Sequence, residues 1–159
     1  IKIGLDTSMR KTEILSIRRE HINLQQLVIY IPKAKAGARE QPITADLGEY
    51  LAAYVATLRP GEQWLFPSPA AKDGRTVNLD KPFRRCVLAA GLDVKQVVRH
   101  TLRHTAITHL VQAGVDLPTV KRISGHKNLS MVERYSHQNG AHIQTAMDKL
   151  SERYKAKAS

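Results

Sequence analysis

The sequence has one cysteine, no long apolar run and no leader-like start. The single thiol, Cys86, excludes an intramolecular disulfide and is compatible with a reducing compartment. No apolar stretch is long enough to span a bilayer, and residues 1–10 lack the regions and cleavage pattern of a signal peptide. We therefore expect a cytoplasmic protein with no membrane partner.

Acidic residues are scarce relative to basic ones. The chain has 14 Asp and Glu against 25 Lys and Arg, which gives a formal net charge of +11 at pH 7. So large a basic excess favours a polyanionic partner, nucleic acid first, although a merely solvated basic surface would have the same composition. With 159 residues, 42% of them hydrophobic, the chain suits one globular domain. Because it starts at Ile1 rather than Met, we expect a domain of a longer protein.

Short β-like runs come early in the chain. Residues 21–24 alternate, residues 27–31 are apolar throughout, and residues 41–43 form a third run, which together predict a small antiparallel sheet. The segment 32–39 is rich in small residues and carries three cations, which predicts a flexible basic hairpin. A basic tip is usually only solvated, but a lysine in it could reach a phosphate in a groove of DNA.

Helical spacing dominates the remainder. Asp46 can cap a helix that stops at residues 60–61, and Asn78 can cap one that stops at Gly91. Further helices are expected over residues 101–114, over 116–125 with Asp116 capping its start, in a capping-box helix at 130–133 with Tyr135 in its second turn rather than deep in the fold, and over 141–155. The patterns predict an α+β fold, a mostly helical domain with a small three-stranded antiparallel sheet.

Residues 100–135 contain the side chains best suited to chemistry. His100 and Arg103 are three residues apart at a predicted helix start, so both point to one face. His126 follows a glycine at the end of the next helix, and Tyr135 comes nine residues later. A cationic cluster near a hydroxyl nucleophile can attack a phosphodiester without a metal ion, because guanidinium groups supply the positive charge that Mg²⁺ would otherwise supply.

Two further patterns have competing interpretations. Arg10 and Glu13 are i,i+3 neighbours, which fits either an ordinary surface ion pair or an arginine oriented by a carboxylate for phosphate binding. His100 and His104 have the i,i+4 spacing of a zinc protease, but the Glu that should follow the first His is Thr101 here, so no metal site is expected. We expect His104 to be structural, hydrogen-bonded beneath the site.

Taken in order, these segments resemble the catalytic domain of the tyrosine recombinases, the phage integrase family, over nearly the whole chain. The family's first box, an arginine with an acidic residue three positions on, is matched by residues 7–15. Its His-x-Leu-Arg-His box is matched by residues 100–104, and its later Gly-His by residues 125–126. The nucleophile of the family, in a Tyr-x-His setting, is matched by Tyr135 and His137.

Some features of the resemblance are less close. The hairpin lysine of the family is best matched by Lys35, with Lys33 as a competing choice. Ser8 stands where the family often has Gly, and Ser124 where an apolar residue usually precedes Gly-His; we expect neither to touch a catalytic side chain. Full-length members also have an N-terminal helical DNA-binding domain, which we expect to be missing, so that residues 1–159 form a single catalytic domain.

The resemblance implies a reaction in which Tyr135 attacks the scissile phosphate and leaves a 3′-phosphotyrosyl link and a free 5′-hydroxyl. The other implied roles are Arg10 and Arg103 on the non-bridging oxygens, Lys35 as acid for the leaving 5′-oxygen, His100 for the tyrosine proton, His126 on the phosphate, and Glu13 as a brace. A covalent intermediate conserves the bond energy, so no ATP, metal ion or other cofactor is expected.

The implied partner is double-stranded DNA. Further DNA contacts are expected from Lys33, Arg39, Arg84, Arg85 and Lys127, although a basic side chain on a helix can equally be only solvated. The family implies a homotetramer on paired DNA sites, a monomer for the isolated domain, and exchange of residues 141–155 between protomers. The alternatives are strand relaxation of the type IB topoisomerase kind and a DNA-binding module in which Tyr135 is idle.

Overall fold

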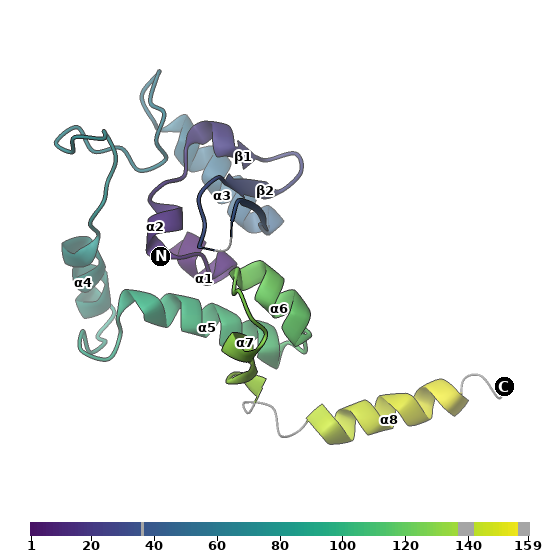
Figure 1. The fold of residues 1–159 in the computed structure, drawn as a ribbon. Coiled ribbons are helices and arrows are strands. Elements are labelled where there is room, and N and C mark those ends of the chain that lie inside the picture. The colour runs from purple at the N-terminus through teal and green to yellow at the C-terminus, as the bar shows by residue number, and fades with distance from the viewer. Residues whose placement is uncertain (36, 137–141, 156–159) are drawn as a thin grey trace.

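The structure, a computed structural model, describes residues 1–35, 37–136 and 142–155. The sheet and most helices lie where the sequence predicts them, whereas the first helix was not predicted (Figure 1). The elements are α1 (Lys2–Thr7), α2 (Lys11–Ile14), the 3₁₀ helix η1 (Arg19–His21), β1 (Ile22–Asn23), β2 (Val28–Ile31), β3 (Arg39–Pro42), α3 (Ala45–Ala56), α4 (Asp80–Ala89), α5 (Arg99–Gln112), α6 (Leu117–Ser124), α7 (Ser130–Glu133) and α8 (His142–Lys155).

The sheet is antiparallel with strand order β1-β2-β3, as predicted. In β2 the side chains of Ile29 and Ile31 are buried and that of Tyr30 is exposed, because alternate residues of a strand face opposite sides of the sheet. Ile31 pairs with Arg39 at the hairpin end of the sheet. The third strand therefore starts at Arg39, two residues before the predicted segment 41–43. Arg39 is part of the sheet and not of the hairpin tip.

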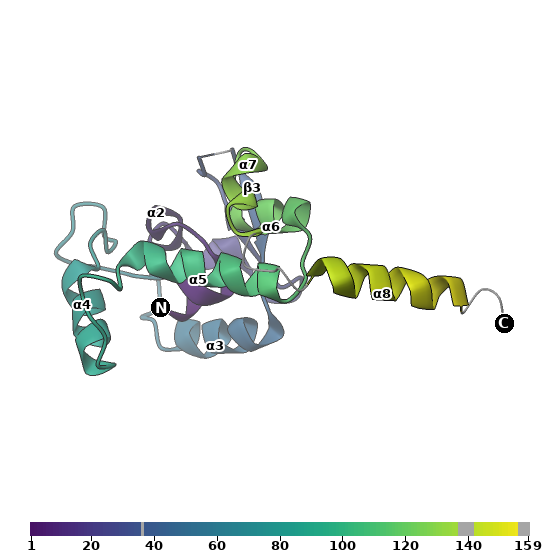
Figure 2. The same cartoon turned by 90° about the horizontal axis from the view of Figure 1, so that it is seen from below.

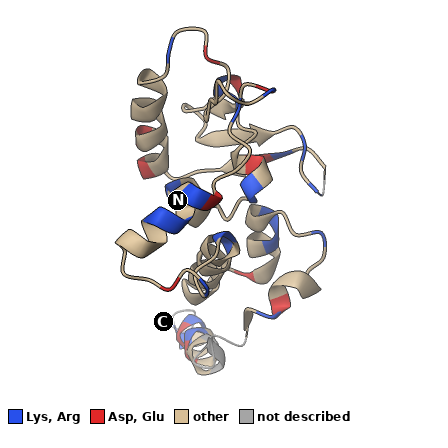
Figure 3. Ribbon diagram, turned by 90° about the vertical axis from the view of Figure 1, so that its left-hand side faces the viewer, with Lys and Arg blue, Asp and Glu red and all other residues tan. Residues whose placement is uncertain are grey.

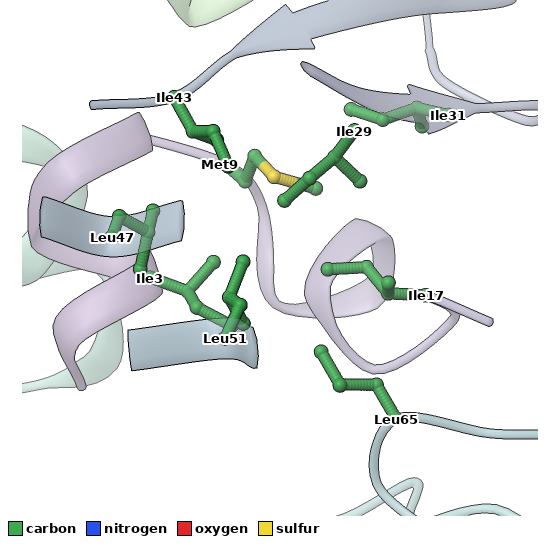
Figure 4. Close-up of a cluster of buried hydrophobic side chains, with 9 residues drawn as sticks. All are labelled: Ile3, Met9, Ile17, Ile29, Ile31, Ile43, Leu47, Leu51 and Leu65. Carbon is green, nitrogen blue, oxygen red and sulfur yellow. The ribbon is translucent and has the colours of Figure 1, made fainter. Parts of the chain in front are cut away.

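A first hydrophobic core joins the sheet to α1 and α3 (Figure 4). It consists of Ile3, Met9, Ile17, Ile29, Ile31, Ile43, Leu47, Leu51 and Leu65. Leu47 and Leu51 are one helical turn apart on α3, so both face this core. The cap of α3 is Thr44, whose Oγ1 accepts a hydrogen bond from the Leu47 amide, so the prediction of Asp46 as the cap was wrong.

A second, smaller core lies between α5, α6 and α7. It contains Ile107, Val111, Val120, Val132 and Tyr135. The predicted cap of α6 is confirmed, because an Asp116 carboxylate oxygen accepts a hydrogen bond from the Thr119 amide. The two cores meet along α5, because α1 packs against that helix. The space between them is where the polar site forms.

Two helices extend away from these cores. α4 lies at one end of α5, and α8 projects from the other end of the molecule (Figures 1 and 2). On α8 the side chains of Met147, Leu150 and Tyr154 are exposed. Within the described residues, no helix combines the length and the apolar character needed to cross a membrane.

Candidate active site

Arg10 is held at the start of α2 by Glu13. The Arg10 amide donates to Glu13 Oε2 at 3.0 Å, and Arg10 Nη1 donates to Glu13 Oε1 at 3.1 Å. The guanidinium also donates to the carbonyl oxygen of Gly125, at 3.2 Å from Nη2 and 3.3 Å from Nη1. The Glu13 side chain is only 3% exposed, so this is a buried ion pair and the interpretation as a surface pair is wrong.

Arg39 approaches the same carboxylate from β3. Its Nη2 lies 3.3 Å from Glu13 Oε2, and its Nη1 donates to Gln41 Oε1 at 2.5 Å and to the Ile123 carbonyl at 3.3 Å. Burial lowers the pKa of the Arg39 guanidinium, and the Glu13 charge works against that shift. Arg39 was predicted to contact DNA from the hairpin, but its described contacts point inward and brace Glu13.

Gly125 lies between these two arginines. It ends α6 in the left-handed region at φ 63°, which glycine adopts without the steric penalty of a Cβ. A Cβ at this position would also lie 2.8 Å from Arg39 Nε and 3.1 Å from Arg39 Cζ. Both the backbone conformation and the close approach of Arg39 therefore require glycine, and its carbonyl is free to accept from Arg10.

Arg103 and His126 form the second half of the cluster. Arg103 Nη1 donates to the carbonyl oxygen of Ser8 at 2.5 Å, and Nη2 lies 3.0 Å from His126 Nε2. Burial, followed by the nearby charge of Arg10, lowers the pKa of Arg103 to about 10. Burial, followed by the charge of Arg103, lowers the pKa of His126 to about 4, so this imidazole is neutral at pH 7.

Ser124 contacts His126 directly. Its Oγ lies 2.7 Å from His126 Nδ1, so the expectation that Ser124 touches no catalytic side chain was wrong. The left-handed turn at Gly125 brings the two side chains together, although they are only two residues apart in the chain. Ser8 also contacts a predicted catalytic side chain, but through its backbone: its carbonyl oxygen accepts a hydrogen bond from Arg103 Nη1.

Tyr135 is buried, with 6% exposure, in the turn after α7. Its hydroxyl lies 2.5 Å from His104 Nδ1 and accepts a hydrogen bond from Arg134 Nη2 at 3.1 Å, and the Arg134 guanidinium lies 5.1 Å from the ring centroid. The predicted capping box is wrong, because Leu129 rather than Ser130 is the residue before the first helical position. His137 lies outside the described residues.

His104 differs from its predicted position. The residue is exposed on α5 and reaches Tyr135, so it does not lie beneath the site. Partial desolvation of the ring, followed by the charge of Arg134, lowers its pKa, which keeps the imidazole neutral at pH 7. Arg134 is a functional candidate that the sequence patterns missed, and its place directly before Tyr135 was the one available signal.

The remaining predicted residues are all exposed. His100 is exposed in the first turn of α5, one turn before Arg103, and Lys35 is exposed in the loop between β2 and β3. The predicted DNA contacts at Lys33, Arg84, Arg85 and Lys127 are all exposed. Lysine and arginine are spread along most of the chain rather than gathered on one element (Figure 3).

A polar cavity adjoins the Glu13 side of the cluster. Its lining includes Arg18, Lys33 and Arg75 together with Trp64. The guanidinium carbons of Arg18 and Arg75 lie 4.8 Å and 5.5 Å from the Trp64 ring centroid, which holds both cations near this cavity. The sequence patterns did not single out either arginine.

The cluster is chemically suited to an anion. Arg10 and Arg39 pair with one carboxylate, Glu13, and Arg103 is close enough to feel its charge, so the summed charge of the cluster is positive and partly desolvated. Within residues 1–35, 37–136 and 142–155, no group of three or more His, Cys, Asp or Glu side chains could hold a metal ion. The guanidinium and imidazole groups of the cluster are of the kinds that bind phosphate oxygens.

A family model described as the phage integrase family matches residues 1–142. The chain belongs to the phage integrase family. Tyrosine recombinase XerD of Staphylococcus epidermidis is 31% identical over 143 residues, which cover 86% of this chain and 48% of that protein. Tyrosine recombinase XerD of Vibrio cholerae is 29% identical over 137 residues, or 82% of this chain and 45% of that protein. This integrase-family chain therefore spans about half the length of these relatives.

Solved structures share the fold of this integrase-family domain. The Tn1549 transposon integrase in complex with circular intermediate DNA aligns over 93% of this chain and 57% of its own, at 20% identity and a TM-score of 0.77. XerH site-specific recombinase bound to a palindromic difH substrate, in a post-cleavage complex, aligns over 92% and 43% at 26% identity and a TM-score of 0.74. The predicted family and fold are confirmed.

Proposed function

We propose that this chain is the catalytic domain of a site-specific recombinase that acts on double-stranded DNA in the cytoplasm. Tyr135 Oη attacks the scissile phosphorus, a 3′-phosphotyrosyl bond forms, and the bond to the 5′-oxygen breaks. Attack by a 5′-hydroxyl reverses the step and rejoins the strand. The observation that carries the proposal is the buried cluster of Arg10, Arg103 and His126, which suits a phosphate without a metal ion.

Arg10 and Arg103 take the non-bridging oxygens in this proposal. The Arg10 side chain is 23% exposed, so part of its guanidinium is open to a ligand, while Glu13 holds the rest in one orientation. The Nη2 of Arg103 points at His126, and a phosphate oxygen could accept from it in place of the imidazole. Positive charge that is already desolvated stabilises the negative charge that develops in the transition state.

His104 accepts the tyrosine proton in this proposal. Its neutral imidazole lies 2.5 Å from Tyr135 Oη, and Arg134, 3.1 Å from the same oxygen, stabilises the phenolate that results. The family resemblance implies His100 for this role instead. Asparagine variants at each position distinguish them, because the true acceptor should lose much more of the single-turnover cleavage rate. A larger loss at His100 would overturn the assignment to His104.

Lys35, exposed in the loop between β2 and β3, protonates the leaving 5′-oxygen in this proposal. A substrate with a 5′-thiol leaving group needs no acid, so it should rescue Lys35→Ala. Rescue of Lys33→Ala instead would move the role by two residues. Lys33, Arg84, Arg85 and Lys127 are exposed and available for backbone phosphates, where each contributes mainly salt-dependent affinity.

The assembly proposed is a homotetramer on paired DNA sites, formed from domains that are monomeric in isolation. α8 is the segment that passes between protomers. Its support is that Met147, Leu150 and Tyr154 are exposed on α8, which extends away from both cores (Figure 1). An apolar helix face that is uncovered on its own domain is suited to a groove on another.

A covalent adduct tests the proposal. The protein is incubated in EDTA with a nicked duplex that contains the recombination site from the DNA flanking its gene. We expect an adduct from the wild type and from the matched control Tyr50→Phe, whose tyrosine is 51% exposed on α3. Tyr135→Phe should give none. An adduct that survives this substitution, or that forms only with a divalent metal ion, would contradict the mechanism.

A further inference from the structure

Ser124 restricts the protonation of His126. The serine is fully buried at the last position of α6, and its hydroxyl donates to the Val120 carbonyl at 2.7 Å. A hydroxyl has one proton, so at its 2.7 Å contact with His126 Nδ1 the serine oxygen is the acceptor. Nδ1 must therefore carry a hydrogen.

Arg103 is compatible with the same tautomer. Its Nη2 lies 3.0 Å from His126 Nε2 and 3.5 Å from Nδ1, and because a guanidinium only donates, the nitrogen without a hydrogen, Nε2, is the one that can accept from it. The charged and titratable groups around the ring are Arg10, Arg103, His104 and Arg134. The arginine charges, together with burial, keep the imidazole neutral at pH 7. The single N–H of the ring, at Nδ1, therefore donates to Ser124 Oγ, and Nε2 has a lone pair that can accept from Arg103.

This tautomer has a consequence for phosphate binding. In the free protein Nε2 has no hydrogen to offer a phosphate oxygen. A phosphate at Arg10 and Arg103 would draw the Arg103 donors toward itself and add negative charge beside the ring. Both changes favour a proton on Nε2, and the Ser124 oxygen remains as acceptor for Nδ1–H, so it stabilises the imidazolium as well as the neutral ring.

We propose that Ser124 is a positioning residue that holds His126 in the Nδ1–H tautomer, so that Nε2 is the nitrogen that exchanges Arg103 for a phosphate oxygen. On phosphate binding, Nε2 takes a proton from solvent and donates it in a hydrogen bond to that oxygen. The inference rests on the proposed function, in which the cluster holds a phosphodiester. The family resemblance leads us to expect an apolar residue at this position, and such a residue would offer no acceptor.

The tautomer can be measured without any activity. In the wild-type protein, labelled with ¹⁵N in its histidines, long-range ¹H–¹⁵N correlation at pH 7 should show His126 with a protonated Nδ1 and an unprotonated Nε2. His126→Gln assigns the signals. A resting Nε2–H tautomer, or a mixture of the two, would overturn the proposal even if the protein is an active recombinase.

Cleavage tests the positioning role. Loss of one hydrogen bond to the imidazolium should slow single-turnover cleavage by Ser124→Ala about tenfold, with DNA affinity unchanged. The substitution removes an acceptor that stabilises the imidazolium, so it makes His126 harder to protonate. The ratio of the wild-type to the variant cleavage rate should therefore increase from pH 6 to pH 8. Ser124→Thr keeps the oxygen and should retain the wild-type pH profile, and Ser130→Ala removes an exposed serine as the matched control.

The outcomes separate the inference from the proposed function. A wild-type rate for Ser124→Ala, or a loss of equal size at every pH, would show that the hydroxyl only fills space and would overturn the positioning role. Failure of the proposed function would instead appear as a wild-type protein that forms no Tyr135 adduct. If Ser124→Ala does not fold, the wild-type tautomer and the Ser124→Thr profile still decide the matter.

Discussion

Gly125→Ala should destabilise the domain far more than an alanine at a comparable glycine. Both Gly125 at φ 63° and Gly91 at φ 70° are in the left-handed region, so alanine costs about 1 kcal/mol of backbone strain at either position. At Gly91 no atom lies within 4 Å of the added Cβ, whereas at Gly125 the Cβ would lie 2.8 Å from Arg39 Nε. The difference between the two variants isolates the contact with Arg39.

The size of that difference depends on which hydrogen bonds of the Arg39 guanidinium are weakened. Moving its guanidinium weakens the hydrogen bonds to the Ile123 carbonyl and to the buried Glu13 carboxylate, and charged hydrogen bonds contribute about 1.5–3 kcal/mol each. We therefore expect Gly125→Ala to lose about 2 kcal/mol more unfolding free energy than Gly91→Ala. For a domain of this size, the corresponding extra fall in melting temperature is about 4–8 °C.

Urea and thermal unfolding of both variants, with and without Arg39→Ala, give the measurement. In the Arg39→Ala background the crowding is gone, so the excess loss at Gly125 should disappear. Equal losses for Gly125→Ala and Gly91→Ala in the presence of Arg39 would refute the idea that Arg39 packs against this turn. An excess that persists without Arg39 would place its cause elsewhere.

Three further predictions concern charge, pH and the C-terminal helix. Glu13→Gln should cost about 3 kcal/mol of unfolding free energy, because it leaves two partly buried guanidinium groups without their buried carboxylate. Glu20→Gln, at an exposed pair, should cost under about 1 kcal/mol in the same urea titration. His126 has a pKa of about 4 in the folded protein and 6.5 in the unfolded chain, so between these pH values the unfolded chain binds more protons. The contribution of the neutral ring to the unfolding free energy is therefore full above pH 6.5 and is lost as the pH falls toward 4, by at most about 3 kcal/mol. His126→Gln should flatten this part of the pH profile measured by urea unfolding. Removal of the residues after Asn139 should leave the melting temperature nearly unchanged and abolish tetramer formation on paired DNA sites, whereas a domain that unfolds would show that α8 belongs to its own core.

Local patterns were enough to predict most of the elements. Alternation and apolar runs located the strands, and helical spacing with caps such as Asp116 located the longer helices. α1 was missed because six residues are too few to show a period. Tyr135 was expected near the surface, but the short α7 packs onto α5 and α6, and this packing depends on contacts that no local pattern contains.

The site itself could be predicted only in part. The spacing of Arg10 and Glu13 allowed either a surface ion pair or an arginine oriented by a carboxylate, and only the structure distinguishes the two. The position of Arg39 could not be predicted, because its contact with Glu13 depends on the register of β3 and on where α6 ends. The same applies to Ser124, since its contact with His126 exists only because the chain turns through the left-handed region at Gly125.

The contacts that assemble this cluster join the two ends of the domain. Arg10 bonds to a carbonyl 115 residues further along, and Arg103 to one 95 residues earlier. During synthesis, a nascent chain that has not yet exposed Gly125 and His126 cannot form this cluster, however many basic residues it already displays. Under the proposed function, products of translation or proteolysis that end before this point would therefore be unable to cleave DNA.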